Sequence, residues 1–171
     1  MNKISFQTDV LPLKNELFRL ALRITQNSAE AEDVVQETMM KVWNRREQWS
    51  QIESIEAFCL TICRNLSLDK MRRMDNQAQT LEPGNDPVDR SYGADPEQQA
   101  VQRDRVALVR QLIARLPEKQ RTAMQLRDIE GKSYRDIATV MSITEEQVKI
   151  SIFRARQTIK KEFKRQEEYG L

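Results

Sequence analysis

The fold of this chain is decided by residues 116–161, LPEKQRTAMQLRDIEGKSYRDIATVMSITEEQVKISIFRARQTIKK, which predict three helices in quick succession. Pro117 suits the first position of a helix, where its missing N–H has no partner to lose. Gly131 stands where that helix should end, because a left-handed residue after a helix is least costly as glycine. The first of the three helices is therefore predicted between these two residues.

Two further helix starts are marked by capping residues. Ser133, followed by Asp136, predicts the N-terminal cap of a short second helix with a carboxylate in its first turn. Thr144, followed by Gln147, predicts a capping box that opens the third helix. The connection between these helices is only residues 141–144, the length that helix-turn-helix units use.

The side chains of this stretch divide into an inward and an outward set. The apolar set that can form one small core is Tyr134, Ile137, Ala138, Met141, Ile143, Val148 and Ile152. The residues left facing outward are Glu146, Gln147, Lys149, Ser151 and Arg154. Three packed helices of an ordinary bundle would show similar spacing. However, residues 145–165 hold seven Lys or Arg against three Glu, so phosphate neutralisation by a DNA-reading helix is favoured.

Composition predicts an all-α protein of one large or two small domains. The chain has 171 residues, of which 32% are charged and 6% aromatic, and it contains no alternating run that indicates a strand. Its net charge of +2 hides an asymmetry, since residues 81–99 are acidic and residues 100–171 are basic. The positive field therefore coincides with the predicted DNA-reading helices.

Several function classes are disfavoured by what the sequence lacks. There is no histidine, so Ser-His and Cys-His nucleophilic schemes are excluded, and no metal or other cofactor is expected. Cys59 and Cys63 lie in an apolar helical run and are expected to be small buried side chains of a reduced cytosol. No signal peptide or apolar run of membrane-spanning length is found, so we expect a soluble cytoplasmic protein without membrane insertion, catalytic activity or small-molecule substrate.

The chain order predicts two helical domains joined by an acidic, flexible linker. In the first domain, residues 1–80, helices are expected at about 13–25, 30–49 and 55–77, the second opened by an Asn27 cap and the third by Ser54. Breakers and acidic residues make 81–95 the linker. The second domain, 96–171, restarts with Asp95 as cap and Pro96 at the first helical position.

Two helices of the first domain have faces whose function periodicity leaves open. In the second helix, the inward stripe is Val34, Val35, Thr38, Met39, Val42 and Trp43, and the opposite face shows Glu30, Asp33, Gln36, Glu37 and Lys41. Such a face is either solvated surface or a docking site. In the third helix, the inward residues are Phe58, Cys59, Ile62, Leu66 and Met71, and the outer ones are Arg64, Asn65, Asp69, Lys70, Arg72 and Arg73. These basic residues either complement the helix macrodipole or contact nucleic acid.

Together, the second helix and the opening stretch resemble the sigma-70 family of bacterial transcription initiation factors, and more closely its extracytoplasmic-function (ECF) branch. The resemblance covers about residues 13–163 and rests on segments 31–37 (AEDVVQE), 41–43 (KVW), 116–117 (LP), 134–138 (YRDIA), 148–149 (VK) and 153–156 (FRAR). The sequence departs from the family pattern at Asp136, usually Glu, at Ser142, a turn position usually Gly, and at Met39, usually aromatic. The long N-terminal region of primary sigma factors is absent, as in the ECF branch.

The resemblance implies roles for the first domain. Core RNA polymerase, through the clamp helices of its largest subunit, is expected to bind Asp33, Gln36, Glu37 and Lys41. The minus-ten promoter element is expected to be engaged by Arg64, Asn65, Asp69, Lys70, Arg72 and Arg73. In related factors a base is flipped out of the stack here, and Asn65 is the candidate for lining its pocket.

For the second domain, the resemblance implies binding of the minus-thirty-five element in the major groove. The residues expected to contact bases or phosphates are Thr144, Glu146, Gln147, Lys149, Ser151, Arg154, Arg156 and Lys160. The family also implies an anti-sigma factor as a partner, often membrane-anchored. Two other hypotheses remain beside this alternative sigma factor: an autonomous helix-turn-helix regulator, which would need a dimerisation element, and a helical adaptor with a merely solvated basic face.

Overall fold

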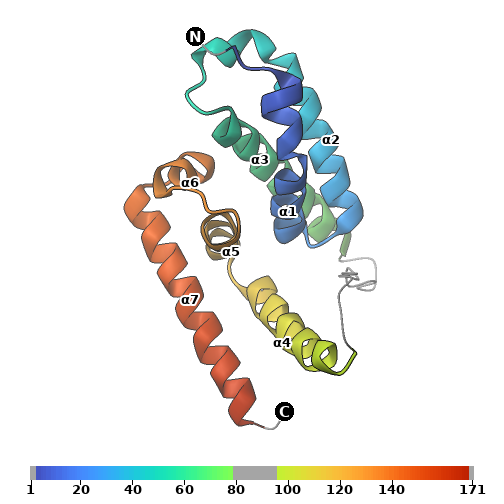
Figure 1. Cartoon of the computed structure of the whole chain (residues 1–171), viewed down its shortest axis with the longest axis vertical. Helices are drawn as coiled ribbons and strands as arrows, with labels where there is room; N and C mark the ends of the chain where they lie inside the picture. Colours follow the sequence, from blue (N-terminus) through green and yellow to red (C-terminus); the bar gives the residue numbers. More distant parts are fainter. Residues whose placement is uncertain (1–2, 79–95, 170–171) are drawn as a thin grey trace.

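The chain folds into two groups of helices that pack directly against each other (Figure 1). The computed structural model describes residues 3–78 and 96–169, with side chains described in 3–77 and 103–169. Every regular element in these ranges is helical, which confirms the predicted all-α fold of two small helical domains. The predicted linker at 81–95 and the Asp95 cap lie outside the described residues.

The N-terminal group is built from three long helices, α1, α2 and α3, which all contact one another. Its elements are η1 (Phe6–Val10), η2 (Leu11–Leu13), α1 (Lys14–Thr25), α2 (Ser28–Asn44), η3 (Arg46–Gln51) and α3 (Ile55–Ala78). Helix α1 packs against both α2 and α3, because its apolar residues recur at helical spacing. The fully buried side chains of α1 are Leu17, Leu20, Ala21 and Ile24.

The second helix is shorter than predicted. It ends at Asn44, and the residues that continue the predicted helix form the 3₁₀ helix η3. This tighter winding returns Trp49 to the core, where it is 8% exposed and its indole N–H donates to the Val42 carbonyl at 3.1 Å. A buried indole N–H needs a hydrogen-bond acceptor, and the turn into η3 places Trp49 beside the Val42 carbonyl. The Asn27 cap is confirmed, since its side chain accepts from the Glu30 N–H at 3.0 Å.

The C-terminal group contains the three closely spaced helices that the sequence predicts, preceded by one long helix. Its elements are α4 (Pro96–Arg115), α5 (Glu118–Met124), η4 (Gln125–Ile129), α6 (Tyr134–Met141) and α7 (Glu145–Glu168). Pro117 is the cap residue before α5 rather than its first helical residue, a shift of one position. In Figure 1 the red helix α7 and the yellow helix α4 extend away from the N-terminal group.

The predicted caps of α6 and α7 are confirmed. Ser133 accepts from the Asp136 N–H at 3.1 Å. Thr144 accepts from the Gln147 N–H at 3.1 Å, and the Gln147 side chain accepts from the Thr144 N–H at 3.0 Å. The small predicted core also forms: Ile137, Met141, Val148 and Ile152 are buried, and Tyr134, Ala138 and Ile143 are partly buried against them. Residues 133–154 therefore have helix-turn-helix geometry.

Two residues in the left-handed region mark the turns on either side of α6. Gly131 has φ +69°, and the Lys132 N–H closes the turn on the Leu126 carbonyl at 2.9 Å. Ser142 has φ +55° in the turn between α6 and α7. A residue with a Cβ pays roughly 1–2 kcal/mol for this conformation, so the serine makes the turn at a cost that glycine would avoid.

Cys59 and Cys63 are buried free thiols in α3, as the sequence predicts. The Cys63 thiol donates to the Leu17 carbonyl at 3.3 Å across the contact between α1 and α3. Burial raises the pKa of each thiol to about 12. Within the described ranges, no helix is long and apolar enough to cross a membrane.

We predict that Ser142→Gly raises the free energy of unfolding by about 0.5–1 kcal/mol, because glycine adopts the left-handed turn without a Cβ penalty. Urea denaturation of the full chain measures the change. Gly131→Ala is the matched control of opposite sign. A Cβ at Gly131 would meet no atom within 4 Å, so only the backbone conformation costs free energy there. Changes of the same sign in both variants would contradict this account.

The two thiols are predicted to be inert in the folded protein. At pH 8 a maleimide reagent should label neither Cys59 nor Cys63 until urea unfolds the chain, since the thiolate is the reactive form. The raised pKa also gives a sign for stability. The unfolded thiols ionise above about pH 8.5 and the folded ones do not, so unfolding becomes easier as pH rises from there toward 12. Rapid labelling of native protein would contradict both expectations.

Candidate docking and nucleic-acid interfaces

The outer face of α2 brings together the four residues predicted to bind the polymerase. Asp33, Gln36 and Lys41 are exposed and Glu37 is partly exposed. Their spacing of three, four and eight residues from Asp33 puts them on one stripe of the helix. Met40 lies on the same stripe and is 66% exposed. Sequence reasoning missed Met40, although its position on an otherwise polar face was a signal.

The end of α2 carries an aromatic cluster that the sequence analysis did not predict. Trp43 was expected to point inward, but its side chain is 46% exposed. It packs edge to face on Phe6 and Trp49, with ring centroids 5.5 and 6.2 Å away, and Arg46 lies over its ring at 4.6 Å. Trp43 is therefore a half-buried edge of the core beside the polar stripe, because Trp49 occupies the interior position.

The six residues of α3 predicted to contact the minus-ten element do not share one face. Asn65, Asp69, Arg72 and Arg73 are exposed and lie together, with Arg72 3.9 Å from Asp69. Lys70 turns toward α2, where it pairs with Glu30 at 3.4 Å. The exposed group retains an amide and two guanidinium groups, which are the donors that bases and phosphates accept from.

Arg64 is the exception among these six residues. The expectation that it lies on the outer face is wrong, since it is only 8% exposed. Its guanidinium donates to both carboxylate oxygens of Glu118 in α5, at 3.2 and 3.1 Å, and the Thr122 hydroxyl donates to the same carboxylate at 2.7 Å. Glu118 lies 54 residues further along the chain, so no local pattern could reveal the pair. The role of Arg64 toward DNA stays a prediction.

Helix α7 presents the expected residues at its N-terminal end. Thr144, Glu146, Gln147, Lys149 and Arg154 are exposed, and Ser151 is partly exposed. Gln147 uses its carbonyl oxygen in the capping box, and its amide NH₂ group keeps two donors. The capping box also fixes the start of the helix, which determines where the following side chains point.

Lys149 is oriented by an aromatic ring. Its ammonium lies 5.3 Å from the Tyr134 ring centroid, and the Arg127 guanidinium lies 4.1 Å from the same centroid. Arg127 in turn donates to the Lys132 carbonyl at 2.8 Å. The Tyr134 ring thus contacts one cation from η4 and one from the start of α7, and its electrostatic attraction favours both positions.

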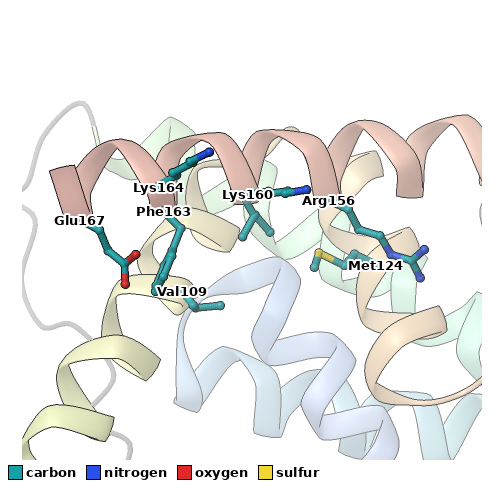
Figure 2. Close-up of a pocket in the computed structure, with 8 residues that line it drawn as sticks. Val109, Met124, Arg156, Lys160, Phe163, Lys164 and Glu167 are labelled. Atoms are coloured by element: carbon teal, nitrogen blue, oxygen red, sulfur yellow. The ribbon is translucent and has the colours of Figure 1, made fainter.

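Arg156 and Lys160 lie on a different side of α7. Arg156 makes a two-pronged ion pair with Asp128, and this hydrogen bonding raises the pKa of its guanidinium. Both residues border an open groove of about 520 Å³ between α4, α5 and α7 (Figure 2). The groove is lined by Val109, Met124, Arg156, Ile159, Lys160, Phe163, Lys164 and Glu167. Their predicted phosphate contacts would therefore need a surface other than the one that carries Gln147 and Arg154.

Two exposed apolar residues of α7 were missed by sequence reasoning as site residues. Ile150 is 43% and Phe153 is 63% exposed, and they lie among Glu146, Lys149 and Arg154. Apolar side chains on a major-groove helix can contact the methyl group of thymine. Their positions in the sequence indicated this exposure. Val148 and Ile152 already form the inward face of the helix, so Ile150 and Phe153 fall on its outward face.

The described side chains hold no group of His, Cys, Asp or Glu that could bind a metal ion. What the structure does provide is one polar helix face on α2, one mixed amide and guanidinium face on α3, and one helix-turn-helix whose second helix exposes cations, an amide and apolar groups. The composition of these faces suits macromolecular partners, and the exposed side chains of α7 include donors of the kind that contact phosphates and bases.

Comparison with known proteins matches both groups of helices. The family model described as Sigma-70 region 2 matches residues 10–77, and that described as Sigma-70, region 4 matches residues 107–159. The RNA polymerase sigma-H factor of Pseudomonas aeruginosa is 32% identical over 167 residues, which cover 94% of this chain and 86% of that protein. The ECF RNA polymerase sigma factor SigE of Mycolicibacterium smegmatis is 32% identical over 148 residues, 85% of this chain and 56% of that protein.

A solved structure has the same arrangement of helices. It is the sigma factor RpoE in complex with the anti-sigma factor NepR from Bartonella quintana. The likeness has a TM-score of 0.73 at 24% identity and covers 91% of this chain and 94% of that one. The shared fold therefore extends over both helical groups.

Proposed function

The chain belongs to the sigma-70 family of RNA polymerase sigma factors, in its extracytoplasmic-function branch, and we propose that its three exposed helix faces divide the work of promoter recognition. As a sigma factor it binds core RNA polymerase and directs transcription initiation at specific promoters. Catalysis belongs to the polymerase. The proposal assigns a separate partner to each of the faces of α2, α3 and α7.

The face of α2 is assigned to core polymerase. Asp33, Gln36 and Glu37 would contact the clamp helices of the largest subunit, with Lys41 at one end of the stripe. Met40 would supply the apolar centre of this contact, since its side chain is 66% exposed between polar neighbours. An adaptable thioether surrounded by polar groups is a common composition for a protein-binding surface.

The exposed face of α3 is assigned to the minus-ten element. Asn65 would bind the edge of an extruded base, and Arg72 and Arg73 would bind phosphates or bases beside it. Base extrusion costs a few kcal/mol, which contacts made by the polymerase must help to offset.

The single observation that supports the proposal best is the exposed face of α7 in its helix-turn-helix. A capped helix there leaves Gln147, Lys149 and Arg154 exposed on the half of its surface that faces away from the core. That side suits the major groove of the minus-thirty-five element, with Ile150 and Phe153 placed for contacts with thymine methyl groups.

Reconstituted transcription tests the proposal against its alternatives. Core polymerase with this chain should initiate on a cognate genomic promoter, and core polymerase alone should not. An autonomous helix-turn-helix regulator would instead bind its site without polymerase, as a dimer on two half-sites. A helical adaptor would retain promoter recognition after Lys149→Ala combined with Arg154→Ala.

An anti-sigma factor is part of the proposed function. The solved RpoE structure records that sigma factor with an anti-sigma factor, and this chain shares its fold over 91% of its length. We expect a comparable regulator, soluble or membrane-anchored, to restrain this chain until a signal releases it.

Asp33→Lys is predicted to weaken binding to core polymerase by at least about tenfold, because it places a cation where the proposed contact requires an acidic group. Binding of labelled protein to core polymerase measures the change, and circular dichroism verifies that the chain stays folded. Glu47→Lys is the matched control, since it makes the same charge change at an exposed position in η3. Equal affinities for wild type and Asp33→Lys would remove α2 from the polymerase contact.

Lys149→Ala is predicted to change the salt dependence of promoter binding by the polymerase complex. The slope of log K against log salt should become shallower by about 0.9, as expected for one lost phosphate contact. Phe153→Ala is the uncharged comparison, and it should weaken binding with no change in slope. A Lys149→Ala slope equal to the wild-type slope would contradict the proposed phosphate contact.

A further inference from the structure

Glu146 is an exposed acidic residue at the centre of the outward face of α7. It precedes Ile150 and Phe153 by four and seven residues, so these three side chains form one stripe. Val148 and Ile152 are buried on the opposite side of the helix. A carboxylate in this position repels the phosphates that the neighbouring cations would attract, so its presence needs a physical explanation.

The Glu146 carboxylate makes no hydrogen bond or ion pair with any residue that the structure describes. Lys149 is three residues further along the helix, which is a suitable spacing for an ion pair. Its ammonium instead lies 5.3 Å from the centroid of the Tyr134 ring in α6. The oxygens of Glu146 are therefore available to accept hydrogen bonds from a partner.

The helix macrodipole offers a purely structural role for Glu146. Glu145 and Glu146 both lie in the first turn of α7, where a carboxylate complements the positive end of the helix. The two residues differ in direction, because Glu145 precedes the buried Val148 and Ile152 by three and seven residues and lies at the edge of their stripe. The macrodipole would make the two glutamates equivalent, whereas contact with DNA would involve Glu146 rather than Glu145.

Glu146 and Gln147 present opposite hydrogen-bonding groups at the start of α7. This is the end at which the second helix of a helix-turn-helix contacts base edges. A carboxylate only accepts hydrogen bonds. The Gln147 carbonyl already accepts from the Thr144 N–H at 3.0 Å, so its NH₂ group is what this side chain offers. Glu146 thus supplies the acceptors at this end of the outward face.

The base that matches an acceptor at this position is cytosine. In the major groove cytosine presents its N4 amino group as a donor, whereas guanine and thymine present acceptors. Adenine presents an N6 amino group beside its N7 acceptor, and N7 repels a carboxylate. A carboxylate contact therefore favours cytosine over the three other bases.

Ile150 and Phe153 sharpen this discrimination. Their side chains are 43% and 63% exposed on the same stripe as Glu146, so they would exclude water from the carboxylate on contact with the groove. A carboxylate that loses its water without gaining a donor costs free energy. Base edges that present acceptors are thus rejected, which is a repulsive contribution to specificity.

We propose that Glu146 is a specificity-determining residue, whose carboxylate accepts from the N4 amino group of a cytosine in the minus-thirty-five element and excludes the other bases at that position. This inference rests on the proposed binding of α7 in the major groove and deepens it, since it assigns one base to one side chain. Glu146 lowers the general affinity of the helix for DNA while it raises selectivity.

Selection from a promoter library tests the proposal. The full chain with core polymerase is bound to duplexes in which the minus-thirty-five segment is randomised and the rest of a cognate promoter is kept. Wild type should enrich cytosine about tenfold over the other bases at one position of the segment. Glu146→Gln should shift that position to adenine, because an amide binds N6 and N7 of adenine together. Glu146→Ala should leave no preference there.

Glu145→Gln is the matched control. It removes the same charge from the same helical turn, and it should leave cytosine enriched as in wild type. Circular dichroism should show equal helix content for wild type and all the variants, so that a change in base preference reports the contact rather than the fold.

The proposal is overturned if Glu146→Gln retains the wild-type base preference at every position. It is also overturned if this variant only raises binding to all sequences by the same factor, which is the effect of removing a carboxylate that repels phosphates. Enrichment of a base other than cytosine at the position that depends on Glu146 would contradict it as well. A wild-type chain that enriches no sequence in the segment would instead refute the assignment of α7 to the minus-thirty-five element.

Discussion

The two-pronged ion pair between Arg64 and Glu118 connects the two helical groups of this sigma factor. Arg64 belongs to the helix predicted to engage the minus-ten element, and Glu118 begins the helices that support α7, which is proposed to read the minus-thirty-five element. The pair is only partly solvated, and Thr122 donates to the same carboxylate. Because each charge pairs with the other, neither group is available to another partner while the pair persists. Arg64 is therefore buried by a contact with the other helical group.

The surfaces that stay free share a physical composition. On α2 and on α7, charged and amide side chains surround exposed apolar groups: Met40 in one case, Ile150 and Phe153 in the other. Exposed apolar side chains contribute little burial free energy to the folding of the free chain. They contribute favourable free energy when a partner buries them, while the surrounding charges determine the orientation of the partner and the rate of encounter. This composition suits a subunit that acts by docking rather than by catalysis.

Sequence reasoning was most successful where the determining interactions are local. The caps at Asn27, Ser133 and Thr144 were predicted and are formed. The division of the helix-turn-helix into an inward core and an outward face was also correct. The larger errors lie at α2 and α3: the helix expected to reach Trp49 ends at Asn44, and Arg64 is buried. Each error arises from a tertiary demand, an acceptor for a buried indole in one case and a distant carboxylate in the other.

By itself the sequence determined the helices, their caps, the basic character of the last helix and, through its motifs, the family. These properties depend on residues that lie within a turn or two of one another, so spacing and composition are enough to specify them. Only the tertiary structure decided which charged residues remain available. Arg19 pairs with Glu130 across 111 positions, and Arg64 pairs with Glu118 across 54. Such partners are selected by how the helices pack, and no local spacing encodes that packing.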